Sequence, residues 1–115
     1  MKVAVQGSKE FKDYQIFMRS MAVAMSSLNK GDTLSIYSVG PHKINSFIAG
    51  FVNLSEDGMK ARGMNIKYYK VSHSWMEERL DQMDYFVYLS KPKESPSRLV
   101  RNAESRDVEV GIFRY

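Results

Sequence analysis

The sequence contains no cysteine, which excludes several kinds of site at once. A disulfide framework, a thiolate zinc site, an iron–sulfur cluster and a cysteine nucleophile all require that residue. Long apolar runs are missing as well. The runs Val3 to Val5 and Met21 to Met25 are far too short for a membrane-spanning helix, and the first is too short for a signal peptide. We therefore expect a soluble, unprocessed, cytoplasmic protein.

Motifs with a fixed spacing are also absent. Neither GxGxxG nor GxxxxGK[ST] occurs, so neither a dinucleotide fingerprint nor a Walker motif is predicted. The chain has 2 histidines, His42 and His73, and a metal site would need more ligands than these. The acidic residues between Glu77 and Asp84 are typical of a solvated helix face rather than of an acid–base pair. We expect no metal and no cofactor, and we name no catalytic residue.

The chain does have enough apolar content for one packed domain. Its 115 residues are 43% apolar, which fits a single domain over residues 1–115. The formal net charge of +4 suits either a mildly basic surface or attraction to phosphate groups. Because the positive charges do not form one block, a nucleic-acid partner is not predicted.

Apolar periodicity predicts strands that alternate with helices. We expect strands near residues 2–6, 33–37, 65–71, 85–89 and 108–113. The run Tyr85 to Leu89 is almost entirely apolar, as is typical of a central strand buried on both faces. The alternation favours right-handed crossovers. It therefore predicts an α/β fold, a single Rossmann-like three-layer domain with a five-stranded parallel sheet in the order 3-2-1-4-5.

The first two crossovers carry clear helix signals. Asp13 is a plausible N-cap of a helix that runs to Leu28, and Gly31 suits a left-handed stop. The next helix is predicted from five apolar positions that match the helical template, namely Ile44, Phe47, Ile48, Phe51 and Val52. We expect Phe47, Ile48 and Phe51 to belong to the core.

Weaker signals predict three further helices. Ser55 resembles a fresh N-cap, which predicts a short extra helix that ends near Gly63. A short polar helix is expected over residues 75–83. Ser95 is predicted to cap the last helix, with Pro96 in its first turn.

The candidate binding site lies in the loops that follow the strands. Open parallel sheets bind ligands outside the strand carboxyl ends, where the chain order reverses, and helix N-termini there suit phosphate or carboxylate. Gly7, Ser8 and Lys9 combine a flexible backbone, a hydroxyl and an ammonium group, although an ordinary turn has the same composition. Gly40 permits close approach of a ligand, and His42 suits a phosphate or a proton-transfer role.

A stacking platform for a base is a second feature that the aromatic residues could supply, with Tyr68, Tyr69, Trp75, Tyr85 and Tyr88 as its candidates, although packing is the commoner role for any one of them. Trp75 is the strongest candidate because its neighbours are polar. The predicted ligand-binding residues are Gly7, Ser8, Lys9, Ser38, Gly40, His42, Trp75 and Ser97.

The segment from Val3 to Tyr14 resembles the opening of the SLOG superfamily, in particular its small YspA/YpsA-related branch. Members begin with a strand, then Gly-Ser or Gly-Arg, an aromatic residue, Asp and Tyr. Four later segments resemble the branch in the same order, namely 38–45 (a glycine-rich turn), 74–75 (a Trp after the third strand), 79–87 (an Arg–Met helix and an Asp) and 95–110 (the last turn, helix and strand).

The resemblance implies a Rossmann-like sheet, recognition of nucleotide-derived ligands and frequent oligomers. The chain departs from the family pattern at Val39 and Lys43, where glycines are usual, at Asn45, which replaces Asp, and at residues 95–97, which replace a Gly-Thr phosphate turn. Residues 55–63 resemble an insertion. The PGGxGT turn and catalytic glutamate of the phosphoribohydrolase members are missing, so that activity is not implied.

Three functions remain open from the sequence. The first is non-catalytic binding of a nucleotide-derived or phosphate-bearing ligand. The second is an interaction, assembly or accessory protein, of a kind that a bacteriophage would encode, that kept the fold and lost the pocket. The third is hydrolysis of a nucleotide glycosidic bond, with an acid such as Glu10 or Glu77. The many methionines and aromatic residues also favour a homo-oligomer, most simply a two-fold dimer.

Overall fold

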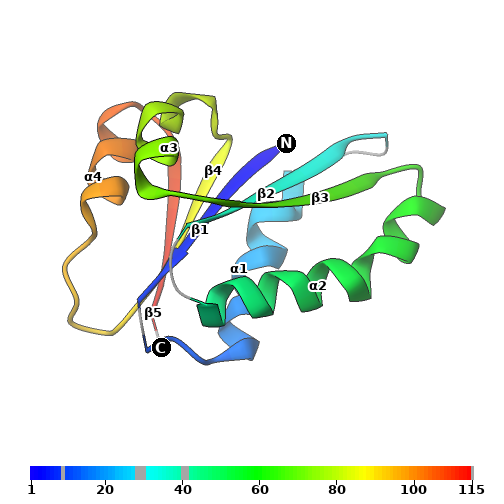
Figure 1. Ribbon diagram of the computed structural model, residues 1–115, viewed down its shortest axis with the longest axis horizontal. Helices are drawn as coiled ribbons and strands as arrows, with labels where there is room; N and C mark the ends of the chain where they lie inside the picture. The colour runs from blue at the N-terminus through cyan, green and yellow to red at the C-terminus, as the bar shows by residue number, and fades with distance from the viewer. Residues whose placement is uncertain (9, 28–30, 40–41, 115) are drawn as a thin grey trace.

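The computed structural model describes residues 1–8, 10–27, 31–39 and 42–114 (Figure 1). Strands and helices alternate along it. The elements are β1 (Lys2–Gly7), α1 (Tyr14–Ala24), β2 (Thr33–Val39), α2 (His42–Ala61), β3 (Asn65–Val71), α3 (His73–Glu78), β4 (Tyr85–Ser90), α4 (Arg98–Ser105) and β5 (Glu109–Arg114). Two short 3₁₀ turns, Met25–Ser27 and Leu80–Gln82, follow α1 and α3.

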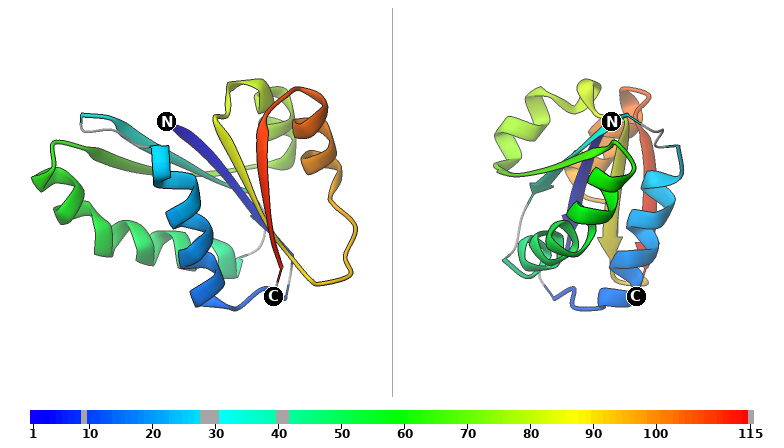
Figure 2. Two further views of the ribbon diagram at one scale, coloured as in Figure 1. Left: turned by 180° about the vertical axis from the view of Figure 1, so that it is seen from behind. Right: turned by 90° about the vertical axis from the view of Figure 1, so that its right-hand side faces the viewer.

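The five strands form one parallel sheet in the order β3-β2-β1-β4-β5. The predicted fold class and strand order are therefore confirmed. Helices α1 and α2 cover one face and α3 and α4 cover the other, which gives the three layers of a Rossmann-like domain (Figures 1 and 2). Chain order reverses between β1 and β4, so the carboxyl ends of these two central strands are the expected ligand edge.

The central strands divide the core into two parts. All six residues of β4 are buried, as the apolar run predicts. Along β1, Val3 and Val5 pack on the α1–α2 side, whereas Ala4 packs on the α3–α4 side. Successive side chains of a strand point to opposite faces, so Gln6 shares the face of Ala4. A polar side chain is thereby placed at the carboxyl end of the central strand.

Helix α2 corrects the prediction of a separate helix after Ser55. The chain stays helical through Ser55, because Phe51, Ser55 and Met59 follow one another at steps of four residues along one side. Phe51 and Met59 are both buried against the sheet. A new N-cap at Ser55 would break this continuous apolar face. Helix α2 ends before Gly63, whose φ of +74° is the left-handed conformation expected there.

The other predicted core residues of α2 differ in burial. Ile48 is fully buried, and Phe47 is only partly buried and packs against the rim of the core. Phe47 is held by edge-on ring contacts with Phe11 and Tyr14.

The predicted end of α1 also needs adjustment. Asp13 caps the helix as predicted, since its side chain accepts from the backbone N–H of Ile16 at 3.1 Å. The α-helix proper ends at Ala24, and Leu28 lies outside the described residues. Gly31 has the predicted left-handed conformation, with a φ of +92°.

The last two helices begin at residues other than those predicted. The third crossover is helical from His73 rather than from Trp75, with Ser72 as its N-cap, so Trp75 lies in the middle of α3 and not at its start. Helix α4 is capped by Ser97 rather than Ser95, because the Ser97 hydroxyl accepts from the backbone N–H of Val100 at 3.3 Å. None of the helices in the described ranges has both the length and the apolar character that a bilayer crossing requires.

Candidate functional site

Gln6 lies at the carboxyl end of β1, where the strand order reverses. Its side chain is 7% exposed, and its amide links two helices. The Ser97 hydroxyl, at the start of α4, donates to Gln6 Oε1 at 2.7 Å. Gln6 Nε2 lies 3.2 Å from Nε2 of His73, the first residue of α3. One buried amide therefore connects the beginnings of α3 and α4.

The direction of these hydrogen bonds follows from the donors. The Ser97 hydroxyl accepts from the Val100 N–H, so its own proton is available for Gln6 Oε1. The amide nitrogen of Gln6 is then left to face His73, and it can only donate. His73 consequently accepts at Nε2, and a neutral ring carries its proton on Nδ1. Nδ1–H is the donor that this arrangement leaves for another group.

Gly7 has a packing role that the sequence does not reveal. A Cβ at this position would lie 2.6 Å from Ile44 Cδ1, and Ile44 is fully buried on α2. The neighbouring Ser8 N–H donates to the Leu89 carbonyl at 3.0 Å. The space beside Gly7 is therefore filled by Ile44, and the Ser8 N–H is already used in a hydrogen bond to the backbone. Both positions make contacts within the fold.

Ser38 lies on the opposite side of the sheet from Gln6. It is 1% exposed, and its hydroxyl donates to Asn45 Oδ1 on α2. The Tyr68 hydroxyl donates to the Asn45 carbonyl at 3.4 Å. Burial raises the pKa of the Tyr68 phenol, and its interaction with Ser38 opposes that rise. This polar cluster anchors α2 to β2 and β3, and Ser38 takes part in it through a hydrogen bond within the fold.

The loop between β4 and α4 is fixed by two charged side chains. Glu94 accepts from the Tyr88 hydroxyl at 2.9 Å and from the Lys91 N–H at 3.4 Å. Arg114 Nη1 donates to the carbonyls of Lys91, Pro92 and Glu94 at 2.9, 3.1 and 3.2 Å. Lys91 also forms an ion pair with Glu10 from the loop after β1. The ion pair therefore connects the loop after β4 to the loop after β1 at the carboxyl edge of the sheet.

Trp75 lies near the carboxyl edge, on the face of the sheet that α3 covers. Its ring stacks on Tyr37 of β2, with ring centroids 5.3 Å apart and planes 22° apart. The Arg79 guanidinium carbon lies 4.4 Å from the centroid of the Trp75 ring. Of the predicted aromatic platform, Trp75 and Tyr69 therefore share one face, and Tyr37 lies between them as a member that the sequence did not indicate.

The predicted site residues are only partly brought together. The structure joins Ser97 to Gln6 and His73, two residues that the prediction of site residues missed. Lys9 and Gly40 lie outside the described residues. His42 is described as the first residue of α2, but its side chain is not among the described groups. The one signal that pointed to Gln6 was an amide directly after a buried apolar run.

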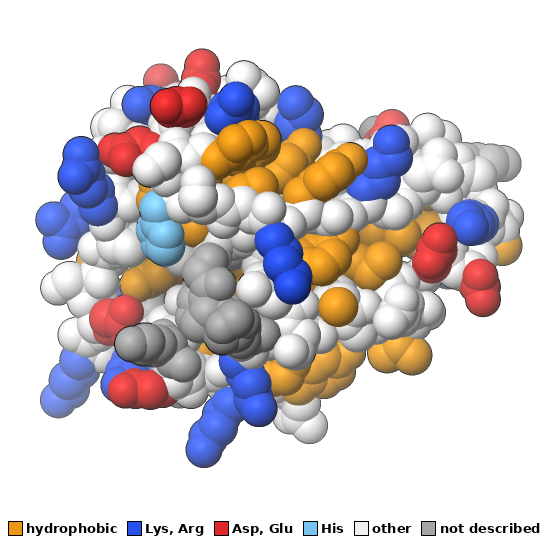
Figure 3. Space-filling view, in the orientation of Figure 1, with side chains coloured by type: hydrophobic (Ala, Val, Ile, Leu, Met, Phe, Trp, Pro, Cys, Tyr) orange, Lys and Arg blue, Asp and Glu red, His pale blue; other side chains and the backbone are white. Residues whose placement is uncertain are grey.

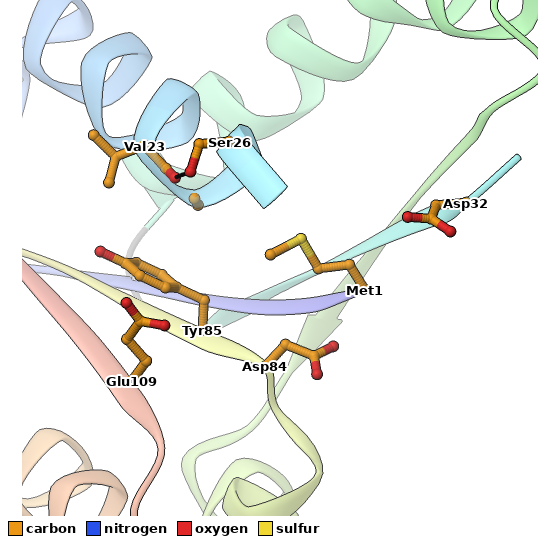
Figure 4. Close-up of a pocket in the computed structure, with 8 residues that line it drawn as sticks. Met1, Val23, Ser26, Asp32, Asp84, Tyr85 and Glu109 are labelled. Carbon is orange, nitrogen blue, oxygen red and sulfur yellow. Dashed lines mark hydrogen bonds between the residues drawn. The ribbon is translucent and has the colours of Figure 1, made fainter. Parts of the chain in front are cut away.

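A separate hollow of about 480 Å³ lies at the amino ends of the strands (Figure 4). It is lined by Met1, Val23, Ala24, Ser26, Asp32, Asp84, Tyr85 and Glu109. Burial, and then the charge of Glu109, raise the pKa of the Tyr85 phenol. Three carboxyl groups line this hollow, so it disfavours a phosphate. The described residues include no group of three or more His, Asp or Glu side chains placed to hold a metal ion.

Comparison of the chain with protein-family models, with curated proteins and with solved structures finds no match.

Proposed function

We propose that the protein binds a nucleotide-derived, phosphate-bearing ligand without catalysis at the carboxyl edge of the sheet. The observation that carries the proposal is the buried Gln6 amide, which holds His73 and Ser97 together at the point of chain reversal. Open parallel sheets bind their ligands at that point. The SLOG-like segment from Val3 to Tyr14 supports the same class of ligand.

The chemistry of the edge suits recognition better than reaction. His73 offers an Nδ1–H donor to a phosphate or ribose oxygen, and Lys9 adds a positive charge to the loop after β1. Glu10 is paired with Lys91, and Glu77 is paired with Arg98 and accepts from Asn102. Both acids that a glycosidic hydrolase would use are therefore engaged with groups of the protein itself.

A second candidate function is an interaction or accessory protein that kept the fold and lost the pocket. A specific observation favours it, because Ile44 occupies the space beside Gly7. The hydroxyls of Ser38 and Ser97 are likewise used inside the fold. Under this function, the partner engages another surface, and changes at the carboxyl edge leave its binding unaltered.

Two measurements distinguish ligand binding from the interaction or accessory function. They are calorimetric titration with mononucleotides and cyclic nucleotides, and the shift in unfolding temperature that these ligands cause. A ligand at 100 times its Kd stabilises the folded state by about 2.7 kcal/mol. Lys9→Ala removes a charge-assisted bond worth about 1.5–3 kcal/mol and should weaken binding roughly ten- to a hundredfold. His73→Ala should weaken binding by a smaller factor. Lys60→Ala, on the last turn of α2, is the matched control for charge.

Absence of any nucleotide-induced shift in the unfolding temperature would contradict the binding proposal. Unchanged affinity in both Lys9→Ala and His73→Ala would also do so, because the ligand would then lie elsewhere.

A further inference from the structure

The α3 face of the sheet is open over β2 and β3. Figures 1 and 2 show these strands projecting beyond the short helices α3 and α4, whereas α2 runs along their other face. Figure 3 shows hydrophobic side chains gathered above β3 next to α3, with Lys and Arg side chains around them. We call this surface the open face and define it by Lys2, Ser35, Lys67, Tyr37, Tyr69, Trp75 and Arg79.

A column of parallel rings forms the apolar part of the open face. Tyr69 stacks on Tyr37 with centroids 5.1 Å apart and planes 18° apart, and Tyr37 stacks on Trp75. Arg79 lies over the Trp75 ring and closes that end of the column. The other end is Tyr69, which is 41% exposed and stands on the edge strand β3. Among the described residues, Tyr37 is the ring partner of Tyr69.

A row of polar residues crosses the sheet directly beside this column. In the strand register, Lys67 pairs with Ser35, and Ser35 pairs with Lys2. This row lies two residues before the row that contains Tyr69 and Tyr37, so its side chains point to the same face. Within the described residues, neither lysine ammonium forms an ion pair, and the acid next to this row is Asp84, which accepts from the backbone N–H of Lys2 at 2.7 Å. The open face therefore combines stacked rings with unpaired positive charge.

We propose that the open face binds single-stranded nucleic acid. A base stacks on the outer face of Tyr69 and extends the column, while Lys67 and Lys2 pair with backbone phosphates. Aromatic rings and a positively charged track are the two features by which proteins bind single strands without reading sequence. A duplex does not fit this arrangement, because its bases are already stacked and do not present their faces.

Charge complementarity favours this occupant over a second protein chain. The open face carries Lys2 and Lys67 together with Arg79, which is paired with Glu78, and the whole chain carries a formal net charge of +4. Two copies of the same open face would bring Lys2 and Lys67 against the same lysines, and like charges repel. The proposal does not depend on the carboxyl edge, since Gln6, His73 and Ser97 are not among the residues that define the open face.

The test is fluorescence anisotropy of a labelled oligothymidylate of about 12 nucleotides, a length within the range of known single-strand sites. The variants are Tyr69→Ala, Tyr69→Phe and Lys67→Ala, with Lys60→Ala as the charge control on α2. Tyr69→Ala should weaken binding roughly five- to a hundredfold, the loss that a removed base–aromatic stack produces. Tyr69→Phe keeps the ring and should retain the affinity. Circular dichroism checks that each variant is folded.

The salt dependence separates the role of the lysine from that of the ring. Each phosphate contact contributes about 0.7 to the slope of log affinity against log salt for a single strand. Lys67→Ala should lower that slope by about this amount, while Lys60→Ala and Tyr69→Ala should leave it unchanged. Because Trp75 is the one tryptophan of the chain and belongs to the column, its fluorescence should change when the oligonucleotide binds.

Four results would overturn the proposal. The first is no binding at low salt with tens of micromolar protein, and the second is equal affinity of wild type and Tyr69→Ala. The third is displacement of the labelled oligonucleotide by thymidine monophosphate at the same concentration as by unlabelled oligonucleotide. The fourth is sedimentation that shows a dimer in the wild type and a monomer in Tyr69→Ala. The titrations of Lys9→Ala and His73→Ala with mononucleotides test the carboxyl edge, whereas oligothymidylate binding tests the open face. Each of the two proposals can therefore fail while the other holds.

Discussion

At the scale of single residues, Gly7 shows how packing and ligand binding produce the same sequence signal. A glycine after a buried strand is typical of a phosphate turn, and it is equally required where a neighbouring side chain approaches the backbone. The position of Ile44 places Gly7 in the second class. Gly7→Val is therefore unsuitable as a test of ligand approach, because it would disturb the core first.

The Gly7 contact is tested by a double-mutant cycle. Gly7→Ala should destabilise the fold by about 1–3 kcal/mol, the usual cost of an added group in a packed core. Ile44→Val removes the Cδ1 atom that lies nearest to the added Cβ and costs about 0.5–1.5 kcal/mol by itself. The double variant should be more stable than the sum predicts. Strictly additive free energies from urea unfolding would show that the two positions do not meet.

Tyr85 provides a prediction for alkaline pH. Its pKa in the folded state is raised above the ordinary value of 10.0, first by burial and then by Glu109. The unfolded phenol therefore ionises at a lower pH than the folded one, so its contribution to stability is full below about pH 10 and is lost as pH rises through the folded pKa. Tyr85→Phe should lose less stability than the wild type as pH rises through this range.

The measurement is the free energy of unfolding in urea at a series of pH values from neutral to alkaline. Some alkaline loss should remain in Tyr85→Phe, because burial also raises the pKa of Tyr68. Parallel curves for the wild type and Tyr85→Phe would contradict the assignment.

At the scale of elements, strands were predicted more accurately than helix ends. The apolar run from Tyr85 to Leu89 is buried on both faces, and burial alone defines it. The cap at Ser97 could not be distinguished from Ser95 in the sequence, because both serines lie beside Pro96. Tertiary contact decides between them, since only Ser97 meets the buried Gln6 amide. Long-range partners of this kind leave no local pattern.

The candidate site was predicted only in part for the same reason. The carboxyl edge, with the reversal of chain order between β1 and β4, follows from the alternation of strands and helices, and the predicted strand order that defines it is confirmed. Gln6 and His73 are 67 positions apart, so their contact depends on the packed sheet and not on spacing. Tyr37 was missed as a member of the aromatic column because it reads as an ordinary strand residue.

Removal of the Ser97 hydroxyl tests the link between α4 and β1. Ser97→Ala removes the cap and leaves Gln6 Oε1 buried without its donor, which together should cost about 1.5–3 kcal/mol. Ser72→Ala is the matched control, since Ser72 caps the exposed start of α3 through the Trp75 N–H. The control should lose about 1 kcal/mol, as a cap alone does. Equal losses in urea unfolding would mean that the Gln6 bond adds nothing.

Helix α1 carries the surface through which we expect a two-fold dimer. Its solvent side exposes Tyr14 and Met18, which lie four residues apart on one stripe of the helix. Met suits adaptable contact surfaces. Met18→Glu places a charge in this surface and should shift sedimentation from dimer to monomer, whereas Lys60→Glu on α2 should not. A wild-type chain that sediments as a monomer at tens of micromolar would contradict the dimer.

At the scale of the whole molecule, one sheet couples two apolar clusters. Phe51 belongs to the cluster beneath α1 and α2, and Leu99 belongs to the cluster beneath α4. Strands β1 and β4 contribute alternate side chains to the two clusters. Unfolding of either cluster would therefore disturb the strands on which the other cluster packs. A chain of this size is then expected to unfold in a single cooperative transition.

Paired core truncations test that coupling. Phe51→Ala should cost about 3–5 kcal/mol and Leu99→Ala about 2–5 kcal/mol, as large-to-small core changes do. Because the two side chains lie in different clusters on opposite faces of the sheet, the free energies should add to within about 0.5 kcal/mol. Urea unfolding should be followed by Trp75 fluorescence, which reports the α3 side, and by far-ultraviolet circular dichroism, which reports all helices. The two probes should give one midpoint in both single variants. A Leu99→Ala variant whose fluorescence changes at lower urea than its circular dichroism would show that the α3–α4 layer unfolds by itself, and the first turns of α3 and α4 at the carboxyl edge would then belong to a unit that unfolds separately.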